Sequence, residues 1–456
     1  MLIDRRSAVR IIVFTLLSLA GYIWIGYGTV RSDFGQLVIL FGCLSGLYFL
    51  ALRKKVFYVG FPLVIASAML LRTSLILMTP NLTDDYFRFI WDGLLFAHGY
   101  NPYLFLPSQF IHGLHTVTGI TSSLYTGLNS PDYYTVYPPV CEFIFGLSAK
   151  LAGGNILGNI IIIRLIILMA EFVVIFLLYR LASKLSISPN LVAIYAFNPL
   201  VIIELAGNLH LEAVMLLFLV LSVYLLVQKK QLFAAASFGL AVGVKLLPLI
   251  FLPLLIKRLG WLKSITFYTI VGATLIVLFL PFYSIDLIPN FFSSLRLYFQ
   301  TFEFNASLYF LLRWLGYQIT GYNVIATLGV ILAIAISLTI ILIAIKEKTV
   351  TWLSLFQGML MCLTAYFLLA TTVHPWYITS LVLISLFTGY RYPVVWSVVI
   401  ILSYAAYRTV PYSQNLWLVA VEYVIVLSCM GYELFRNMSG SKKDLLFSST
   451  NKDCSI

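Results

Sequence analysis

The sequence predicts an all-helical protein that crosses a membrane many times. Of its 456 residues, 61% are hydrophobic and only 10% are charged, whereas soluble domains carry about 25% charge. Apolar runs of about 20 residues recur along the chain, and each is long enough to cross a bilayer core as a helix. The short alternating segments of a membrane β-barrel do not occur in the sequence. Because backbone groups in lipid must bond within the chain, helices are the expected class.

The apolar runs predict about 12 to 14 transmembrane helices. In chain order we expect them at roughly 8–28, 34–51, 56–78, 155–178, 190–205, 209–228, 264–283, 322–345, 350–370, 377–390, 394–409 and 414–435. The stretch 231–256 contains Lys245, Pro248 and Pro253. Because prolines interrupt helices, we expect a broken pair of short helices there.

Two long polar stretches, 79–153 and 284–320, are expected to be external loops, the first carrying membrane-surface helices. Residues 1–438 are expected to form one transmembrane catalytic domain, and the polar tail 439–456 a disordered cytoplasmic segment.

Positive charge is distributed as in a membrane protein. The net charge is +12, and most of the 29 Lys and Arg residues lie in short loops between apolar runs or near the two ends. Cytoplasmic loops carry such an excess, so both termini are expected in the cytoplasm. This distribution argues against nucleic acid as a partner. The five cysteines have neither metal-site nor disulfide-framework spacing.

The first long loop contains the most informative segment. Thr83 or Asp84 is suited to begin a helix, and on that helix Asp85, Arg88 and Asp92 fall at positions i, i+3 and i+7, on one face. One interpretation is a solvated helix with a capping carboxylate and an Arg–Asp pair. The other is a functional face that presents two carboxylates and a guanidinium.

Several motifs decide between these interpretations by resemblance. Asp85-x-x-Arg88-x-x-Trp91-Asp92-Gly93 and Gly99-x-Asn101-Pro102-Tyr103 resemble the first external loop of polyprenyl-phosphate-sugar-dependent glycosyltransferases of the C-type (GT-C) fold. Further motifs occur in the same order: Tyr137-Pro138-Pro139, Asn198-Pro199, Gly207-Asn208-x-His210-x-Glu212, Lys245-x-x-Pro248, Phe304-Asn305-x-Ser307-Leu308-Tyr309 and His374-Pro375-Trp376-Tyr377. The likeness covers about 84–377. It is closest to the bacterial polyprenyl-phosphate-mannose mannosyltransferases, and more distant from the catalytic subunit of the eukaryotic GPI-anchor mannosyltransferase.

The resemblance implies an inverting glycosyltransferase. A hexose, with mannose favoured, moves from a polyprenyl phosphate to a hydroxyl of a glycan, lipid or protein acceptor at the outer face of the membrane. An external carboxylate acts as general base, and Asp85 matches the base position, although the adjacent Asp84 leaves the assignment open.

The remaining site residues are predicted from the same mechanism. Cations must stabilise the leaving phosphate, and Lys245 leads because a Lys at membrane depth is costly; Arg88, Arg313 and His374 are further candidates. Candidates for binding the sugar or acceptor are Asp92, Asn101, Tyr137, His210, Glu212 and Asn305. No cofactor is expected, although the adjacent carboxylates Asp84 and Asp85 leave a divalent ion open.

Two other function classes compete with transfer of a sugar. A secondary transporter would use broken helices, as 231–256 predicts, but also internal repeats, which are not visible in the sequence. A lipid-linked glycan flippase or ligase is the third class; ligases tend to carry more external Arg and His than this chain. The sequons at Asn81 and Asn305 lie in the expected external loops. A glycan at Asn81 would obstruct the site, which favours a bacterial plasma membrane.

Overall fold

The computed structural model describes residues 5–111 and 116–438; the predicted tail 439–456 lies outside the described residues. Every regular element in the described ranges is a helix, and an isolated bridge pairs Phe304 with Thr372. The all-helical membrane class is thereby confirmed. One buried apolar cluster extends from Ile11 in the first helix to Val426 in the last. The single-domain division stays a prediction.

Seven helices in the described ranges are long and apolar enough to cross a membrane: α1 (Arg6–Gly28 of Arg5–Gly28), α2 (Phe34–Arg53), α8 (Ile156–Lys184), α14 with η4 (Trp261–Phe282), α17 (Ile325–Lys346), α18 (Trp352–Leu369) and α21 (Leu416–Asn437 of Leu416–Met438). A pair bent by 55°, Pro189–Ala196 and Pro199–Gly207, makes eight if it is one span. It comprises η1 (Pro189–Val192), α9 (Ala193–Ala196), α10 (Pro199–Val201) and η2 (Ile202–Gly207).

The predicted 12 to 14 spans included stretches that fold as shorter apolar helices. These are α3 (Phe61–Thr73), α11 (Glu212–Val227), α12 (Gln231–Val244), η5 with α19 (Pro375–Tyr377, Ile378–Ser385) and α20 with η6 (Tyr392–Val399, Ile400–Arg408). Residues 231–256 do form a broken pair, because α12 ends before Lys245 and η3 (Leu247–Phe251) leads into α13 (Leu252–Leu259).

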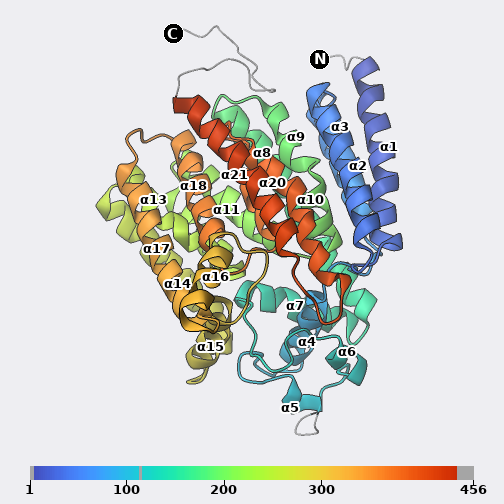
Figure 1. Cartoon of the computed structure of the whole chain (residues 1–456), viewed down its shortest axis with the longest axis vertical. Helices are drawn as coiled ribbons and strands as arrows, with labels where there is room; N and C mark the ends of the chain where they lie inside the picture. The colour runs from blue at the N-terminus through green and yellow to red at the C-terminus, as the bar shows by residue number, and fades with distance from the viewer. Residues whose placement is uncertain (1–4, 112–115, 439–456) are drawn as a thin grey trace.

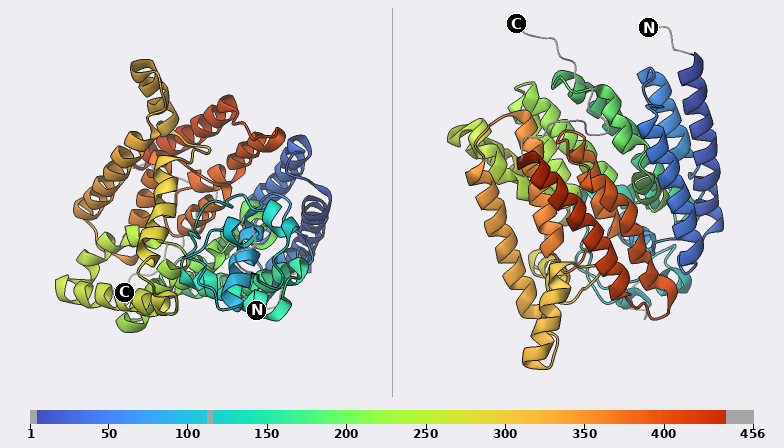
Figure 2. Two further views of the ribbon diagram at one scale, coloured as in Figure 1. Left: turned by 90° about the horizontal axis from the view of Figure 1, so that it is seen from below. Right: turned by 45° about the horizontal axis from the view of Figure 1, so that its top comes forward.

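The helices form a bundle with two different ends (Figure 1). The start of α1 and the end of α21 lie at one end, here called the terminal end. The opposite end, the loop end, carries α4 (Asp85–Ala97), α5 (Ser108–Ile111), α6 (Ser122–Thr126) and α7 (Pro139–Ala152). Beside them lie α15 (Leu287–Gln300) and α16 (Leu308–Thr320) (Figure 2). The two predicted external loops therefore share one end of the bundle.

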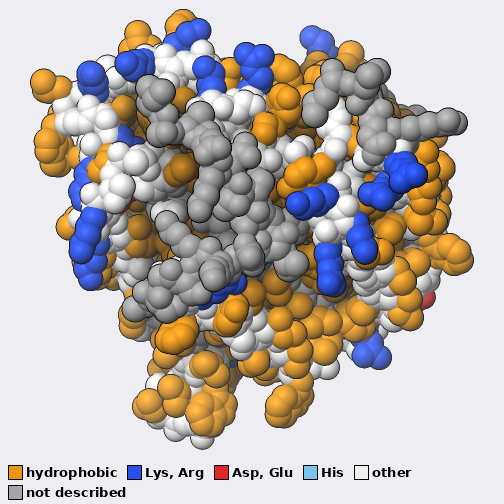
Figure 3. Space-filling model, turned by 90° about the horizontal axis from the view of Figure 1, so that it is seen from above, with side chains coloured by type: hydrophobic (Ala, Val, Ile, Leu, Met, Phe, Trp, Pro, Cys, Tyr) orange, Lys and Arg blue, Asp and Glu red, His pale blue; other side chains and the backbone are white. Residues whose placement is uncertain are grey.

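Hydrogen bonds join the two loops at the loop end. Asn290 Nδ2 in α15 donates to the carbonyl of Tyr103 at 3.0 Å, and Ser294 Oγ donates to the carbonyl of Tyr134 at 2.9 Å. At the terminal end, Lys and Arg side chains gather on the exposed face (Figure 3). A face rich in Lys and Arg is what the positive-inside rule describes for the cytoplasmic side.

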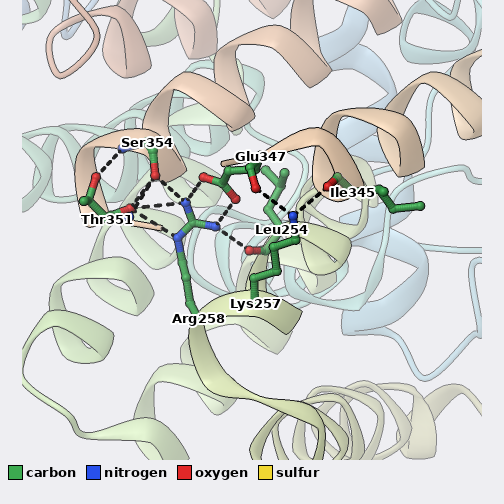
Figure 4. A network of polar contacts seen from close by, with 7 residues as sticks. All are labelled: Leu254, Lys257, Arg258, Ile345, Glu347, Thr351 and Ser354. Carbon is green, nitrogen blue, oxygen red and sulfur yellow. Dashed lines mark hydrogen bonds and ion pairs between the residues drawn. The ribbon is translucent and has the colours of Figure 1, made fainter. Parts of the chain in front are cut away.

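A network of polar contacts joins α13 to the connection between α17 and α18 (Figure 4). Arg258 forms an ion pair with Glu347 and donates to Ser354 Oγ at 2.9 Å. Lys257 Nζ donates to the carbonyls of Ile345 and Glu347 at 2.6 and 2.7 Å. Lys257 therefore also satisfies carbonyls near the end of α17, which have no partner within their own helix.

Inside the bundle, two buried arginines donate hydrogen bonds to backbone carbonyls of the bent pair. Arg72 donates to the carboxylate of Glu171 at 3.0 and 2.8 Å and to the carbonyl of Ala196 at 2.7 Å. Arg164 donates to the carbonyls of Ala206 and Gly207 at 2.7 and 2.9 Å. A bent helix in lipid must find such partners for its free carbonyls. These contacts fix the segment that leads to His210.

Candidate functional site

The candidate site lies where several helix ends meet at the loop end. Asp85 begins α4, His210 and Glu212 lie at the start of α11, and Lys245 lies at the break after α12. The segment 374–377 packs against His210 and Lys245 through ring and charge contacts. Residues far apart in sequence therefore form one cluster, which we call the base cluster: Asp85, His210, Glu212, Lys245, His374, Trp376 and Tyr377.

The first turn of α4 separates the two adjacent carboxylates. Thr83 Oγ1 accepts from the backbone N–H of Asp85 at 3.2 Å, and Asp84 makes no capping bond. Instead Asp84 accepts from Arg31 Nη2 at 2.6 Å. Asp85 accepts from Asn129 Nδ2 at 2.8 Å and faces His210. The two carboxylates thus have different partners, and only Asp85 points into the base cluster.

One ring nitrogen of His210 has hydrogen-bond partners within the protein, and the other has none among the described residues. Its Nδ1 lies 2.8 Å from the backbone carbonyl of Glu204 and 3.3 Å from the carboxylate of the same residue. Its Nε2 is buried, has no hydrogen-bond partner among the described residues, and lies 3.8 Å from Asp85 Oδ2. The ring stacks on Trp376 with centroids 3.8 Å apart. A buried polar atom without a partner is the kind of group that a ligand or proton completes.

Lys245 supplies the cation of the cluster. The chain becomes extended at Lys245, and the thiol of Cys141 donates to the carbonyl of Val244 at 3.2 Å. The ammonium group forms an ion pair with Glu212 and lies 3.8 Å from the centroid of the Tyr377 ring. The Lys245 side chain keeps 29% exposure while that of Glu212 keeps 6%, so Lys245 is the more accessible member of the pair.

The cluster alters the proton affinity of its members. Burial raises the pKa of Asp85, and the nearby His210 and the Asn129 hydrogen bond partly oppose this rise. For His210, burial opposes protonation, but the hydrogen bond and charge of Glu204 with the charges of Glu212 and Asp85 raise its pKa. Burial, Lys245 and His210 together lower the pKa of His374. For Asp85 the direction of this change is the one that a general base needs, because a raised pKa strengthens the carboxylate as a proton acceptor.

Arg88 and Asp92, both predicted as site residues, lie in the packed interior of the loop end. Arg88 Nε donates to both carboxylate oxygens of Asp92, at 2.9 and 2.8 Å, and Nη1 donates to the carbonyls of Ser130 and Tyr133. The Asp92 carboxylate is fully buried. The Arg–Asp pair expected under the first of the two interpretations is therefore present, although it is buried. Through the carbonyls of Ser130 and Tyr133, it also holds the segment next to Asn129.

The Trp91-Asp92-Gly93 motif has a packing explanation. At Gly93 an added Cβ would lie 2.3 Å from the carbonyl oxygen of Phe145 in α7, so the close approach of the two helices requires glycine.

Asn101 and Tyr137 form hydrogen bonds that hold the loop. Asn101 Nδ2 donates to the carbonyl of Phe282 at 2.7 Å, and the carbonyl of Tyr137 accepts from Tyr103 at 2.7 Å. Their predicted contact with a sugar stays a prediction.

Arg313 and Asn305 contact other parts of the chain. Arg313 forms an ion pair with Glu303, which also accepts from Tyr309. Asn305 is buried, and its Nδ2 lies 3.1 and 3.2 Å from the carboxylate oxygens of Glu422. These polar partners all lie outside the base cluster, and the predicted ligand contacts of both residues stay predictions.

Sequence reasoning did not select several residues around the cluster as site residues. Glu204 had a usable signal, because a carboxylate within an apolar run is expensive in a membrane. Arg31 and Asn129 had none strong enough, since short loops contain such residues routinely. Trp376 and Tyr377 belong to the His374-Pro375-Trp376-Tyr377 motif, but no role was predicted for either of them. Within 5–111 and 116–438, no three His, Cys, Asp or Glu side chains are arranged to hold a metal ion.

A mainly apolar pocket lies between α17 and α18, and one member of the base cluster, Tyr377, is part of its lining. Its lining includes Leu332 and Ile336 of α17, Tyr366 and Leu369 of α18, and Thr372 and Tyr377. Tyr377 also contacts the ammonium of Lys245, so this ring adjoins both the pocket and the cation.

Comparison with known proteins gives two matches. Residues 11–260 match the family described as "Alpha-(1->6)-mannopyranosyltransferase, N-terminal domain", and this range contains every member of the base cluster up to Lys245. The chain is also 26% identical over 192 residues to "Alpha-(1->6)-mannopyranosyltransferase A" of Mycobacterium tuberculosis. That match covers 42% of this chain and 35% of the relative, so it spans about a third of the relative's length.

Proposed function

We propose mannosyl transfer as the function, from the premise that this chain belongs to the alpha-(1->6)-mannopyranosyltransferase family. In the proposed reaction an acceptor hydroxyl attacks the anomeric carbon of a mannose carried on a polyprenyl phosphate. The bond between that carbon and the phosphate oxygen breaks with inversion, and the oxygen keeps the electron pair. A transferase needs both a sugar donor and an acceptor, and family membership favours transfer over the transporter, flippase and ligase alternatives.

One observation carries the assignment of the base: Asp85 faces His210 and Lys245 lies in the same cluster, while Asp84 is paired with Arg31. A general base must be within hydrogen-bond reach of the proton that it removes, and its pKa must suit the working pH. The Asp85 side chain keeps 20% exposure, so an acceptor can approach it. The burial of the rest of the group raises its pKa. These properties support Asp85 as the group that accepts the acceptor's proton.

The donor is proposed to lie on the Lys245 side of the cluster. A polyprenyl chain needs an apolar environment within the bilayer, and the pocket between α17 and α18 offers one. Its phosphate then meets Lys245, whose ammonium neutralises the charge that develops on the leaving oxygen. Glu212 and Tyr377 hold that ammonium in place.

The chain is a multi-pass membrane protein, and we propose that it resides in a bacterial inner membrane with the loop end outside. The Lys and Arg side chains at the terminal end support this orientation. It brings the base cluster to the outer face, where the mannose of a lipid-linked donor is available.

The proposal is tested by reconstituting the full chain in liposomes with synthetic polyprenyl-phosphate-mannose and a mannose-terminated acceptor. We expect α-1,6-linked product, which linkage analysis of the product identifies, and the same rate in the presence of a chelator. GDP-mannose serves as the alternative donor. Product from GDP-mannose but none from the lipid donor, in matched amounts of folded protein, would overturn the proposed donor class.

A further inference from the structure

We infer that Glu204 is a positioning residue that holds His210 ready to receive the acceptor's proton from Asp85. This inference rests on the proposed mannosyl transfer and adds a residue that neither the sequence motifs nor the family match singles out. The three side chains come from the bent span, from the turn before α11 and from the first turn of α4. They form a carboxylate–imidazole–carboxylate series.

The surroundings of Glu204 fix its carboxylate. Glu204 is fully buried in η2, the irregular last turn of the bent span. Its Oε1 accepts from the hydroxyl of Tyr404 at 2.7 Å, and its Oε2 accepts from Asn208 Nδ2 at 3.0 Å. Its ionic partner is His210. A carboxylate in this position is costly, so a role toward His210 explains its presence.

The contacts of His210 assign its tautomer. Both groups near Nδ1, the carbonyl and the carboxylate of Glu204, are hydrogen-bond acceptors. The hydrogen of the neutral ring therefore belongs on Nδ1, and Nε2 carries the lone pair. That Nε2 is buried, lacks a hydrogen-bond partner in the part of the chain that the structure describes, and faces Asp85 at 3.8 Å.

The ring is also held in orientation. Leu209, just before it, has a φ of 63°, which residues with a Cβ rarely adopt and which concentrates at functional sites. Trp376 stacks on the ring at an interplanar angle of 17°. The backbone carbonyls before this turn are fixed by Arg164. The direction of Nε2 toward Asp85 is therefore built into the fold.

The proton can be followed through the series. As the acceptor oxygen attacks, its proton passes to the carboxylate of Asp85. Asp85 then passes this proton to Nε2 of neutral His210, which becomes an imidazolium and keeps the Nδ1 hydrogen toward Glu204. The charged groups that face His210 are Glu204, Glu212 and Asp85, with His374 and Lys245 nearby. The gap of 3.8 Å must close by about 1 Å, as catalytic hydrogen bonds do when substrate binds.

The first test reads His210 directly, without enzyme activity. The full chain is labelled with ¹⁵N-histidine in nanodiscs, and of its five histidines His210 is assigned by the signal lost in His210→Gln. At high pH we expect the Nδ1–H tautomer. In Glu204→Gln we expect His210 to titrate at least about one pH unit lower, because a supporting charge is lost.

A matched control separates this effect from a general change in packing. Glu433→Gln replaces another buried carboxylate, one that accepts from the backbone N–H groups of Arg391 and Tyr392, and we expect no change in the His210 signal. An Nε2–H tautomer in the wild type, or an unchanged titration in Glu204→Gln, would overturn the inference.

The second test is kinetic. Glu204→Gln should lower kcat about 10²-fold with little change in the donor KM. In a His210→Gln background, the same substitution should lower kcat by less than about 2-fold, because its effect acts through His210. Equal losses in both backgrounds would overturn the relay. If the wild type transfers no mannose, the proposed function fails, whereas the tautomer and titration still decide the role of Glu204.

Discussion

Arg31 Nη2 donates to Asp84 Oδ2 at 2.6 Å, and this ion pair distinguishes two adjacent carboxylates that the sequence leaves equivalent. Arg31 also lies over the ring of Tyr407, 4.4 Å from its centroid. Asp84 is thereby directed toward the connection between α1 and α2, and Asp85 toward His210. The two carboxylates therefore have different partners, and substitution of each tests the proposal that only Asp85 is the base.

Asp85→Asn should lower kcat/KM for mannosyl transfer by about 10²- to 10⁴-fold, since the general base is lost. Asp84→Asn should lower it by less than about 10-fold, because it removes only a half-exposed ion pair. Both are measured with the lipid donor in matched amounts of folded protein. A larger loss in Asp84→Asn than in Asp85→Asn would reverse the assignment.

The pH dependence of transfer follows from the raised pKa of Asp85. A base works only when deprotonated, so kcat/KM should fall as the pH decreases through this pKa. Because the pKa is raised, the midpoint should lie above the usual value of about 3.9.

The Asn129→Ala variant checks the cause of that midpoint. It removes a hydrogen bond that lowers the pKa of Asp85, so the fall in kcat/KM should move to higher pH. An unchanged or lower midpoint would show that Asp85 does not control this part of the profile.

Lys245→Met should raise the donor KM at least about 10-fold, because the cation of the base cluster is lost. Arg296→Met is the matched control. Arg296 is exposed on α15 and donates to Gln300 of the same helix, so we expect a change in KM of less than about 3-fold. Initial rates over a range of donor concentrations measure both; similar KM values for the two variants would contradict the proposed position of the phosphate.

Asp92→Asn should destabilise the protein by about 3–5 kcal/mol, since it leaves the buried guanidinium of Arg88 without its counter-charge. Asp84→Asn breaks a more exposed pair and should cost about 0–1 kcal/mol. Denaturant unfolding of the purified chain in detergent gives both values. Equal stabilities of the two variants would argue against a structural role for the Arg88–Asp92 pair.

Orientation is checked by labelling with a membrane-impermeant maleimide, in a background whose native cysteines are replaced by serine. Ser123→Cys reports on the loop end, because Ser123 is exposed in α6. Thr349→Cys reports on the other side, because Thr349 is exposed in the turn between α17 and α18. In intact cells we expect label on the first variant and not on the second. The opposite pattern would place the base cluster in the cytoplasm.

Composition and apolar runs were enough to predict the helical membrane class, and Pro248 and Pro253 with Lys245 predicted the break after α12. The motifs also identified Asp85, His210, Glu212 and Lys245, which the structure brings together. These features are local, because span length, helix interruption and motif order can be read along the chain.

The partners of each charge depended on contacts between distant segments. The sequence could not separate Asp84 from Asp85, because Arg31 is 53 residues away from its partner. It could mark Glu204 as a costly carboxylate but could not identify its hydrogen-bond donor Tyr404, which is 200 residues away, nor assign Arg88 to the interior. Only the tertiary structure decides these contacts, because the partners and accessibility of a buried charge depend on the groups that folding packs around it.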